Sequence, residues 1–448
     1  MTTRIWCEYA VLPAGTAAGV SIEIDDDRIV SVESGVAVAP DGDVIRLGGV
    51  TLPGLANGHS HAFHRALRGR THRGQGDFWV WREQMYAVAA RLTPENYLAL
   101  ARATFAEMVL AGYTAVGEFH YVHHSPDGSP YDDPNAMGRA LIEAAVDAGI
   151  RLTLLDACYL RGGWQTELAP EQRRFSDGTA AAWCERVGAL THVSPMCRIG
   201  AAIHSVRAVD APSIAVVAKF AARHEMPLHA HVSEQTAEND QVAGEYGCTP
   251  TEILAQHGAL SPRFTAVHAT HLAAADIGLY ASARCTCCFC PTTERDLADG
   301  IGPSSELRDA GVALSIGSDQ QAVIDPFEEM RGIELDERVR SMRRGTHSPA
   351  ELLAAGSANG YRSLGWGDGG AIAVGALADL VTVSLDSVRL AGCDISALVD
   401  AIVFAATPAD VTDVMVGGRV VVRNGAHVSI DVAASLRDSI AAVTGAGT

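Results

Sequence analysis

Apolar runs of strand length alternate with helical stretches through the middle of this 448-residue chain, and this alternation constrains the fold more than any other feature. Parallel strands need a crossover between them, usually a helix, so the alternation predicts a parallel sheet. Eight runs occur, the number of strands in a closed (β/α)8 barrel. They cover residues 51–61, 113–121, 151–159, 198–206, 227–234, 264–272, 285–291 and 312–319. The predicted fold class is α/β, with a TIM barrel as the main body.

Both ends of the chain have the pattern of short strands joined by turns. Residues 20–24 alternate in polarity and are followed by three aspartates, the pattern of a strand and a turn. Residues 377–383 and 413–425 have the same character, with Gly-Gly and Asn-Gly as hairpin turns. We therefore expect residues 1–50 and 370–448 to pair into one small β-sandwich domain, and residues 51–369 to form the barrel.

The charge of the chain excludes several classes of protein. Acidic residues (53) outnumber basic ones (34), and a net charge of −19 has the wrong sign for a protein that binds nucleic acid through its phosphates. Lys219 is the single lysine and lies outside any Gly-Lys-Ser/Thr sequence, which excludes a phosphate-binding P-loop. The apolar spacing around Lys219 places it on the outward side of a helix, which argues against Schiff-base chemistry.

The sequence shows no signal for a membrane or an oxidising compartment. It lacks a basic start followed by a long apolar stretch, and no uncharged apolar run reaches about 18 residues. We expect a cytoplasmic protein whose ten cysteines are reduced thiols. Four of them are too closely spaced for ordinary zinc ligands and are expected to pack inside a strand. They are Cys285, Cys287, Cys288 and Cys290.

Residues 365–370 match the spacing of a dinucleotide-binding glycine motif. This segment follows a helical stretch and leads into a strand-like run, whereas the motif needs the reverse order. We therefore interpret it as a turn.

Residues that can bind metal or move protons stand at the ends of several predicted strands. Barrel enzymes place their sites at the C-terminal ends of the strands. His59 and His61 point to the same side of the first strand, about 7 Å apart along it. A lone His-x-His is more often a core feature than a metal site, but here four strands contribute such residues. The others are His229, His231, Glu234, His268, His271 and Asp319. The combination predicts a metal site inside the barrel.

The segment Pro53-Gly-Leu-Ala-Asn-Gly-His59-Ser-His61, with the later His231, His268 and Ser318-Asp319, resembles the amidohydrolase superfamily. The resemblance extends over nearly the whole chain. Many members hold two metals bridged by a carboxylated lysine at the end of the fourth strand, where this chain has His204 to Arg207 instead. The resemblance therefore implies the mononuclear branch, with one zinc ion, or Fe²⁺ or another divalent metal. Its implied ligands are His59, His61, His231 and Asp319.

Four further motifs, at residues 59–69, 78–86, 117–124 and 204–209, are similar to the N-formimino-L-glutamate deiminases of histidine degradation. This similarity implies a homodimeric hydrolase that converts N-formimino-L-glutamate to N-formyl-L-glutamate and ammonia with metal-activated water. Glu234 and Asp319 would transfer protons, and His268 would polarise the reacting centre. Contacts to the dianionic substrate are implied for His64, Arg82, Tyr121, His204 and Arg207. His64 stands where some members carry glutamine, and both side chains can donate a hydrogen bond.

Two other functions remain open at this point. A mononuclear deaminase of the same superfamily could act on guanine, a pterin or a related heterocycle, which would favour aromatic stacking and amide groups over paired arginines. A barrel that serves only as a binding or scaffold protein would require vestigial metal ligands. The intact set of histidines and carboxylates argues against that second alternative.

Overall fold

The computed structural model describes residues 2–37, 42–72, 78–191 and 194–445, and it contains two eight-stranded sheets. One is a parallel sheet whose strands follow the order of the sequence. An isolated parallel bridge between Ser60 and Asp319 joins its first and last strands. The predicted (β/α)8 TIM barrel is therefore confirmed. Its strands are β5 (Leu55–Ser60), β6 (Tyr113–His120), β7 (Arg151–Cys158), β8 (Cys197–Ile203), β9 (Leu228–Val232), β10 (Phe264–His268), β11 (Thr286–Phe289) and β12 (Ala313–Ile316).

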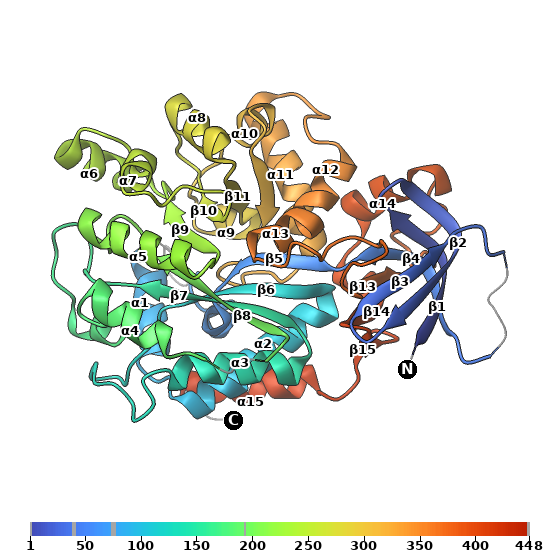
Figure 1. The fold of residues 1–448 in the computed structure, drawn as a ribbon, viewed down its shortest axis with the longest axis horizontal. Coiled ribbons are helices and arrows are strands. Elements are labelled where there is room, and N and C mark those ends of the chain that lie inside the picture. Colours follow the sequence, from blue (N-terminus) through green and yellow to red (C-terminus); the bar gives the residue numbers. More distant parts are fainter. Residues whose placement is uncertain (1, 38–41, 73–77, 192–193, 446–448) are drawn as a thin grey trace.

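Both chain ends contribute to the second sheet, which lies at one end of the molecule (Figure 1). Its strand order is β16-β15-β14-β13-β4-β1-β2-β3. Apolar side chains from both ends of the chain, among them Ile5, Val20 and Leu380, form a core separate from that of the barrel. The strands are β1 (Thr3–Leu12), β2 (Gly15–Asp25), β3 (Arg28–Glu33), β4 (Ile45–Pro53), β13 (Leu380–Val383), β14 (Val411–Val416), β15 (Arg419–Arg423) and β16 (Ala426–His427).

The first predicted strand, residues 51–61, is divided between the two sheets. Strand β4 ends at Pro53 in the second sheet, and β5 begins at Leu55 in the barrel. Gly54 makes the passage, and a Cβ atom there would lie 2.4 Å from the Thr114 hydroxyl. A continuous apolar run does not reveal which sheet each half joins, so the sequence predicted one strand. We propose that the two domains are those predicted, residues 1–50 with 370–448 and residues 51–369, except that the end of β4 to Pro53 belongs to the second sheet.

Helices surround the barrel, and α2 shows how the sequence sets their ends. Thr93 caps its N-terminus, Pro94 follows at the first helical position, and Gly112 ends it with φ 105°. The helices are α1 (Phe78–Ala89), α2 (Pro94–Ala111), α3 (Ala136–Ala148), α4 (Ala180–Gly188), α5 (Ala211–Arg223), α6 (Thr236–Tyr246), α7 (Pro250–Gln256), α8 (Ala274–Ala283), α9 (Pro291–Asp296), α10 (Ser304–Asp309), α11 (Pro326–Ser341), α12 (Pro349–Ala354), α13 (Gly360–Ser363), α14 (Leu398–Ala405) and α15 (Val432–Thr444).

Several shorter features agree with the sequence analysis. The four clustered cysteines of β11 and its flanks are free and buried in apolar surroundings. Within the described residues, no helix combines the length and the apolar character needed to cross a membrane. Helix α15, near the C-terminus, packs against α2 of the barrel. The C-terminal segment therefore belongs to both parts of the molecule, since β13, β14, β15 and β16 lie in the second sheet.

A buried ion pair connects the barrel to the second sheet. Asp379, just before β13, accepts hydrogen bonds from Arg151 of β7 at 2.7 and 3.1 Å. The same carboxylate accepts from the Tyr361 hydroxyl (2.7 Å) and from the Gly417 amide (2.7 Å). Arg151 and Asp379 are each only 1% exposed. Removing one partner of such a pair leaves an uncompensated charge in the interior.

We expect Asp379→Ala to lower the free energy of unfolding by about 3–5 kcal/mol, because it removes the carboxylate that pairs with the buried Arg151 guanidinium. Glu23→Ala is the matched control, since it breaks the exposed pair of Glu23 with Arg4 and is expected to cost less than about 1 kcal/mol. Urea denaturation followed by circular dichroism measures both. Equal effects of the two substitutions would contradict the assignment of Asp379 as a link between the sheets.

Candidate active site

The first and last strands of the barrel meet at two backbone hydrogen bonds. The Asp319 amide donates to the His59 carbonyl (3.0 Å), and the His61 amide donates to the Asp319 carbonyl (3.0 Å). Gly317 permits this close approach, because a Cβ atom there would lie 2.9 Å from both the Cβ and the carbonyl oxygen of His59. Three of the predicted metal ligands are thereby brought side by side.

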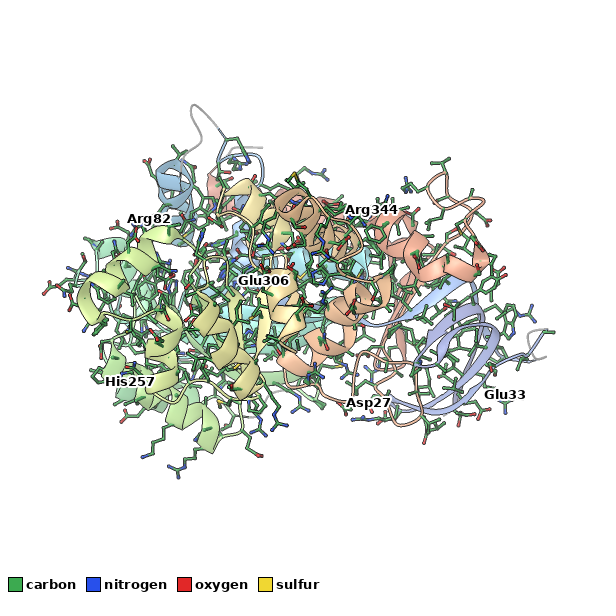
Figure 2. All side chains as sticks on the ribbon, turned by 90° about the horizontal axis from the view of Figure 1, so that it is seen from above. Asp27, Glu33, Arg82, His257, Glu306 and Arg344 are labelled. Carbon is green, nitrogen blue, oxygen red and sulfur yellow. The ribbon has the colours of Figure 1, made fainter. Side chains whose placement is uncertain are left out.

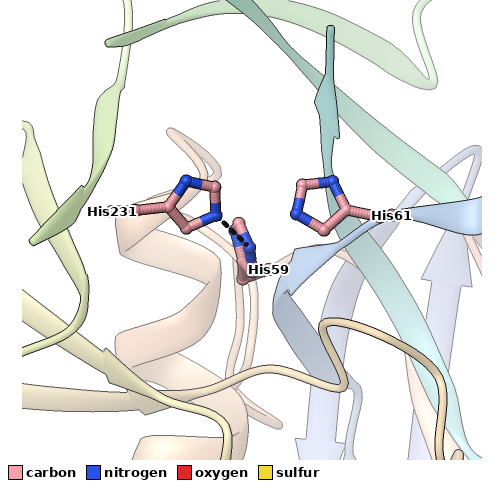
Figure 3. A group of neighbouring side chains, drawn as sticks. All are labelled: His59, His61 and His231. Atoms are coloured by element: carbon pink, nitrogen blue, oxygen red, sulfur yellow. Dashed lines mark hydrogen bonds between the residues drawn. The ribbon is translucent and has the colours of Figure 1, made fainter. Parts of the chain in front are cut away.

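Hydrogen bonds to carbonyl groups orient the imidazoles. His61 Nδ1 lies 2.9 Å from the Phe119 carbonyl, and His231 Nδ1 lies 2.8 Å from the His204 carbonyl. A carbonyl only accepts, so both Nδ1 atoms carry the proton and the Nε2 lone pairs face the centre. Figure 3 shows the rings of His59, His61 and His231 converging, with 3.1 Å between the Nε2 atoms of His59 and His231.

Three of the four predicted ligands, His59, His61 and His231, form a buried group whose ligand atoms lie within 4.8 Å of one another, which could hold a metal ion. The Nε2 atoms of His59 and His61 each lie 3.4 Å from Asp319 Oδ1. Burial, together with the neighbouring imidazoles, holds the pKa of His61 and His231 well below the usual value, and burial also lowers the pKa of His59. Neutral imidazoles and one carboxylate, all buried, are the ligands that zinc takes in catalytic sites.

His268 and Asp319 lie next to each other with left-handed backbones, at φ 70° and 41°. Burial alone would raise the pKa of Asp319, but its hydrogen bond and charge interactions with the histidines hold it well below the usual range. His268 Nε2 lies 3.7 Å from Glu234 and 3.8 Å from Asp319, and its Nδ1 lies 3.3 Å from Glu294. Burial opposes protonation of His268, yet these carboxylates raise its pKa well above the usual value.

All five predicted substrate residues line one cavity of about 450 Å³. They are His64, Arg82, Tyr121, His204 and Arg207. Three of the four predicted metal ligands, His61, His231 and Asp319, line the same cavity, as do Glu234 and His268. Arg82 belongs to α1 and lies in the half of the molecule away from the second sheet (Figure 2). Tyr121 and His64 contact each other, with 3.0 Å between the hydroxyl and Nε2.

Two acidic residues face Arg207, and sequence analysis identified only one of them. Arg207 lies 3.8 Å from Glu234 and 4.0 Å from Glu238. Glu238 is 1% exposed, and neither of its carboxylate oxygens has a hydrogen-bond partner among the described residues. Burial raises its pKa to about 7, against the opposing charge of Arg207. Its neighbours in α6 are mostly polar, so the sequence around it looks like an exposed helix and conceals the buried position.

Glu118 is a second residue that the sequence analysis did not single out. It lies fully buried on β6 and accepts hydrogen bonds from the Ser60 hydroxyl (2.7 Å) and the Ala62 amide (2.7 Å). These contacts hold the chain on both sides of His61. Burial raises the pKa of Glu118 to about 8, although the hydrogen bonds oppose the rise. A carboxylate inside an apolar strand was the signal for it, since such a group needs buried donors.

A second buried group of His120, His123 and Asp156 has the spacing of a metal site. Its carboxylate is already occupied, because Asp156 accepts two hydrogen bonds from Arg186 (2.8 and 2.9 Å). The Trp183 indole adds a third at 2.9 Å. A guanidinium at this position takes the place that a cation would need, so these contacts explain the group as a structural network.

Comparisons with known proteins agree with the geometry. The model of the Amidohydrolase family matches residues 50–421. The formimidoylglutamate deiminase of Pseudomonas aeruginosa is 38% identical over 442 residues, which cover 95% of this chain and 96% of that protein. The chain belongs to the amidohydrolase family. It is a homologue of formimidoylglutamate deiminase and thus a member of a family of hydrolases that act on C–N bonds.

Other members of the amidohydrolase family are also similar. The 8-oxoguanine deaminase of P. aeruginosa is 30% identical, with 96% of each chain covered. A crystal structure of an amidohydrolase from Brucella melitensis has a TM-score of 0.90 at 32% identity and covers 98% of this chain and 99% of that one. An adenosine deaminase from Xanthomonas campestris with bound zinc has the same fold, with a TM-score of 0.82 at 24% identity and 98% and 96% coverage.

We expect Glu118→Leu to weaken zinc binding about 10- to 100-fold, because the chain that carries His59 and His61 loses its buried anchor. Competition with a chromogenic chelator measures the affinity without any need for turnover. Glu107→Gln is the control, since Glu107 binds Arg65 and Arg68 in the following segment and does not contact Ser60. Unchanged zinc affinity in a folded Glu118→Leu protein would show that Glu118 does not support the ligands.

Proposed function

We propose that this chain hydrolyses N-formimino-L-glutamate to N-formyl-L-glutamate and ammonia with one zinc ion, or Fe²⁺ or another divalent metal. The observation that carries the proposal is the presence of two guanidinium groups, Arg82 and Arg207, in the cavity that the metal ligands also line. Two arginines suit a substrate with two carboxylates, since a guanidinium pairs with a carboxylate through two parallel hydrogen bonds. The 38% identity to a formimidoylglutamate deiminase supports the same substrate.

The reaction adds water to the formimidoyl carbon, breaks the bond from that carbon to the terminal nitrogen, and releases this nitrogen as ammonia. A metal held by His59, His61, His231 and Asp319 would supply Lewis-acid activation of water. Glu234 is positioned to take a proton from the water and pass one to the departing nitrogen, because it lines the cavity and lies 3.7 Å from His268. His268 would stabilise charge at the reacting centre.

Local cations in the cavity offset the repulsion between an acidic chain and a dianionic substrate. The chain carries a net charge of −19, which repels a dianion over long distances. Arg207 lies between Glu234 and Glu238, and both carboxylates would weaken its attraction for the substrate if both were charged. The pKa of Glu238, raised to about 7, leaves this carboxyl partly neutral near pH 7, so it offsets less of the positive charge of Arg207 in the cavity.

Deamination of a heterocycle is the second candidate function. Aromatic side chains of the cavity favour it, as do the 30% identities to an 8-oxoguanine deaminase and to a 5-methylthioadenosine/S-adenosylhomocysteine deaminase of Natronomonas pharaonis. The aromatic residues of the cavity are Trp81, Tyr86, Tyr121, Tyr159, Trp164 and Phe175. Arg82 and Arg207 favour the dicarboxylate, since a guanidinium binds a carboxylate through two parallel hydrogen bonds and a neutral heterocycle offers no carboxylate.

An ammonia-release assay on the purified protein with defined metal content separates the two functions. The assay compares N-formimino-L-glutamate, N-formimino-L-aspartate and guanine. We expect the highest kcat/KM for N-formimino-L-glutamate. Turnover of guanine without turnover of either formimino acid would overturn the proposal in favour of the second candidate.

We expect Arg207→Met to raise KM for N-formimino-L-glutamate about 10- to 100-fold, because a charged hydrogen-bond partner of a carboxylate contributes about 1.5–3 kcal/mol. Methionine keeps the apolar stem and removes the charge. Arg161→Met is the control, since Arg161 pairs with Asp210 and is not among the residues of the cavity. An unchanged KM in Arg207→Met would contradict the role of Arg207 in binding the dianion.

A further inference from the structure

Gln172 lies behind the cavity with its amide orientation fixed. It is 1% exposed, on the short 3-10 helix Pro170–Phe175. Its Oε1 accepts a hydrogen bond from the Ala169 amide (2.9 Å), so Nε2 is the donor end. Nε2 lies 2.8 Å from the Tyr159 hydroxyl, 3.0 Å from the Tyr86 hydroxyl and 3.1 Å from the Gly162 carbonyl, and its two N–H groups are shared among these three acceptors. One buried amide therefore contacts two phenols that line the cavity.

The hydrogen bonds that these two phenols already make show which hydrogen bonds they can still form. Tyr86 also receives a hydrogen bond from Arg82 Nε (3.1 Å), and neither the amide nitrogen nor the guanidinium can accept one. Among the described residues, neither hydroxyl has a hydrogen-bond acceptor. Burial, with the neighbouring Tyr86, raises the pKa of Tyr159, so Tyr159 remains a protonated donor. Both O–H groups are thus available for an acceptor in the cavity.

His204 lies between the phenol of Tyr159 and the candidate metal ligand His231. The ring of His204 lies 5.2 Å from that of the ligand His231, measured between ring centres. Tyr159 packs on His204 at 4.4 Å, and Gln172 connects Tyr159 to Tyr86. A substrate whose amidine carbon lies at the metal ligands would place its more distant carboxylate beyond His204, beside these phenols.

We propose that Tyr86 and Tyr159 donate hydrogen bonds to the distal carboxylate of the substrate, and that Gln172 keeps both hydroxyls free to do so. This inference rests on the proposed function, because it assumes a formimino dicarboxylate. Tyr86 and Tyr159 would then cause the preference for a substrate whose side chain ends in a carboxylate. Arg82 adds charge at the same place through its contact with Tyr86.

The test compares N-formimino-L-glutamate with N-formimino-L-norvaline, in which a methyl group replaces the distal carboxylate. We expect Tyr86→Phe and Tyr159→Phe each to raise KM about tenfold or more for the glutamate compound, since each loses one hydrogen bond to a charged group. KM for the norvaline compound should stay within about twofold, because that compound offers no acceptor to the phenols. Tyr9→Phe, in β1 of the second sheet, is the control.

Gln172→Glu tests the role of the amide. The variant preserves the acceptor for the Ala169 amide but replaces the Nε2 donor by an acceptor, which draws both phenol protons away from the cavity. We expect it to lose the preference for the glutamate compound over the norvaline compound. Calorimetric binding of N-formyl-L-glutamate and N-formyl-L-norvaline gives the same comparison without turnover, and thermal unfolding checks that each variant is folded.

The outcomes separate this inference from the proposed function. If the wild-type protein releases ammonia from N-formimino-L-glutamate but the folded Tyr86→Phe and Tyr159→Phe variants keep its preference for the distal carboxylate, the assignment of the phenols is wrong and the function stands. If the wild-type protein acts on neither formimino acid, the function is wrong and the inference falls with it.

Discussion

Closure of the barrel between β5 and β12 is the interaction on which the candidate site depends. Two backbone hydrogen bonds join Asp319 to His59 and His61, so the contact that closes the barrel also brings three candidate ligands together. Asn57 reinforces the closure by accepting from the Ser318 amide (3.0 Å) and donating to the Ser318 hydroxyl (2.6 Å). Without this approach the parallel sheet would remain open, and the carboxylate would lie away from the imidazoles.

Burial sets the chemistry of the groups that this closure assembles. Imidazoles removed from water stay neutral and offer lone pairs, while the carboxylates around His268 favour its charged form. Enzyme sites typically hold neighbouring titratable groups in different protonation states. The same effect of burial, acting on Glu238, reduces the negative charge beside Arg207.

The barrel and the site were predictable from different kinds of pattern. Alternating strands and helices predict the barrel, and residues at the strand ends, such as His59 and Asp319, predict where chemistry gathers, because parallel strands end at one face. The break at Gly54 was not predictable, since one apolar run serves two sheets. Gln172 was not predictable either, because its function depends on contacts with Tyr86, 86 residues away along the chain. Only the tertiary fold creates such contacts.

Anomalous diffraction from crystals grown with zinc tests the central claim most directly, that barrel closure assembles one metal site. We predict a single strong zinc peak per chain, within about 2.0–2.2 Å of the Nε2 atoms of His59, His61 and His231 and of a carboxylate oxygen of Asp319. A second ion beside the first would contradict the mononuclear site. A peak at His120, His123 and Asp156 instead would contradict the account of both groups.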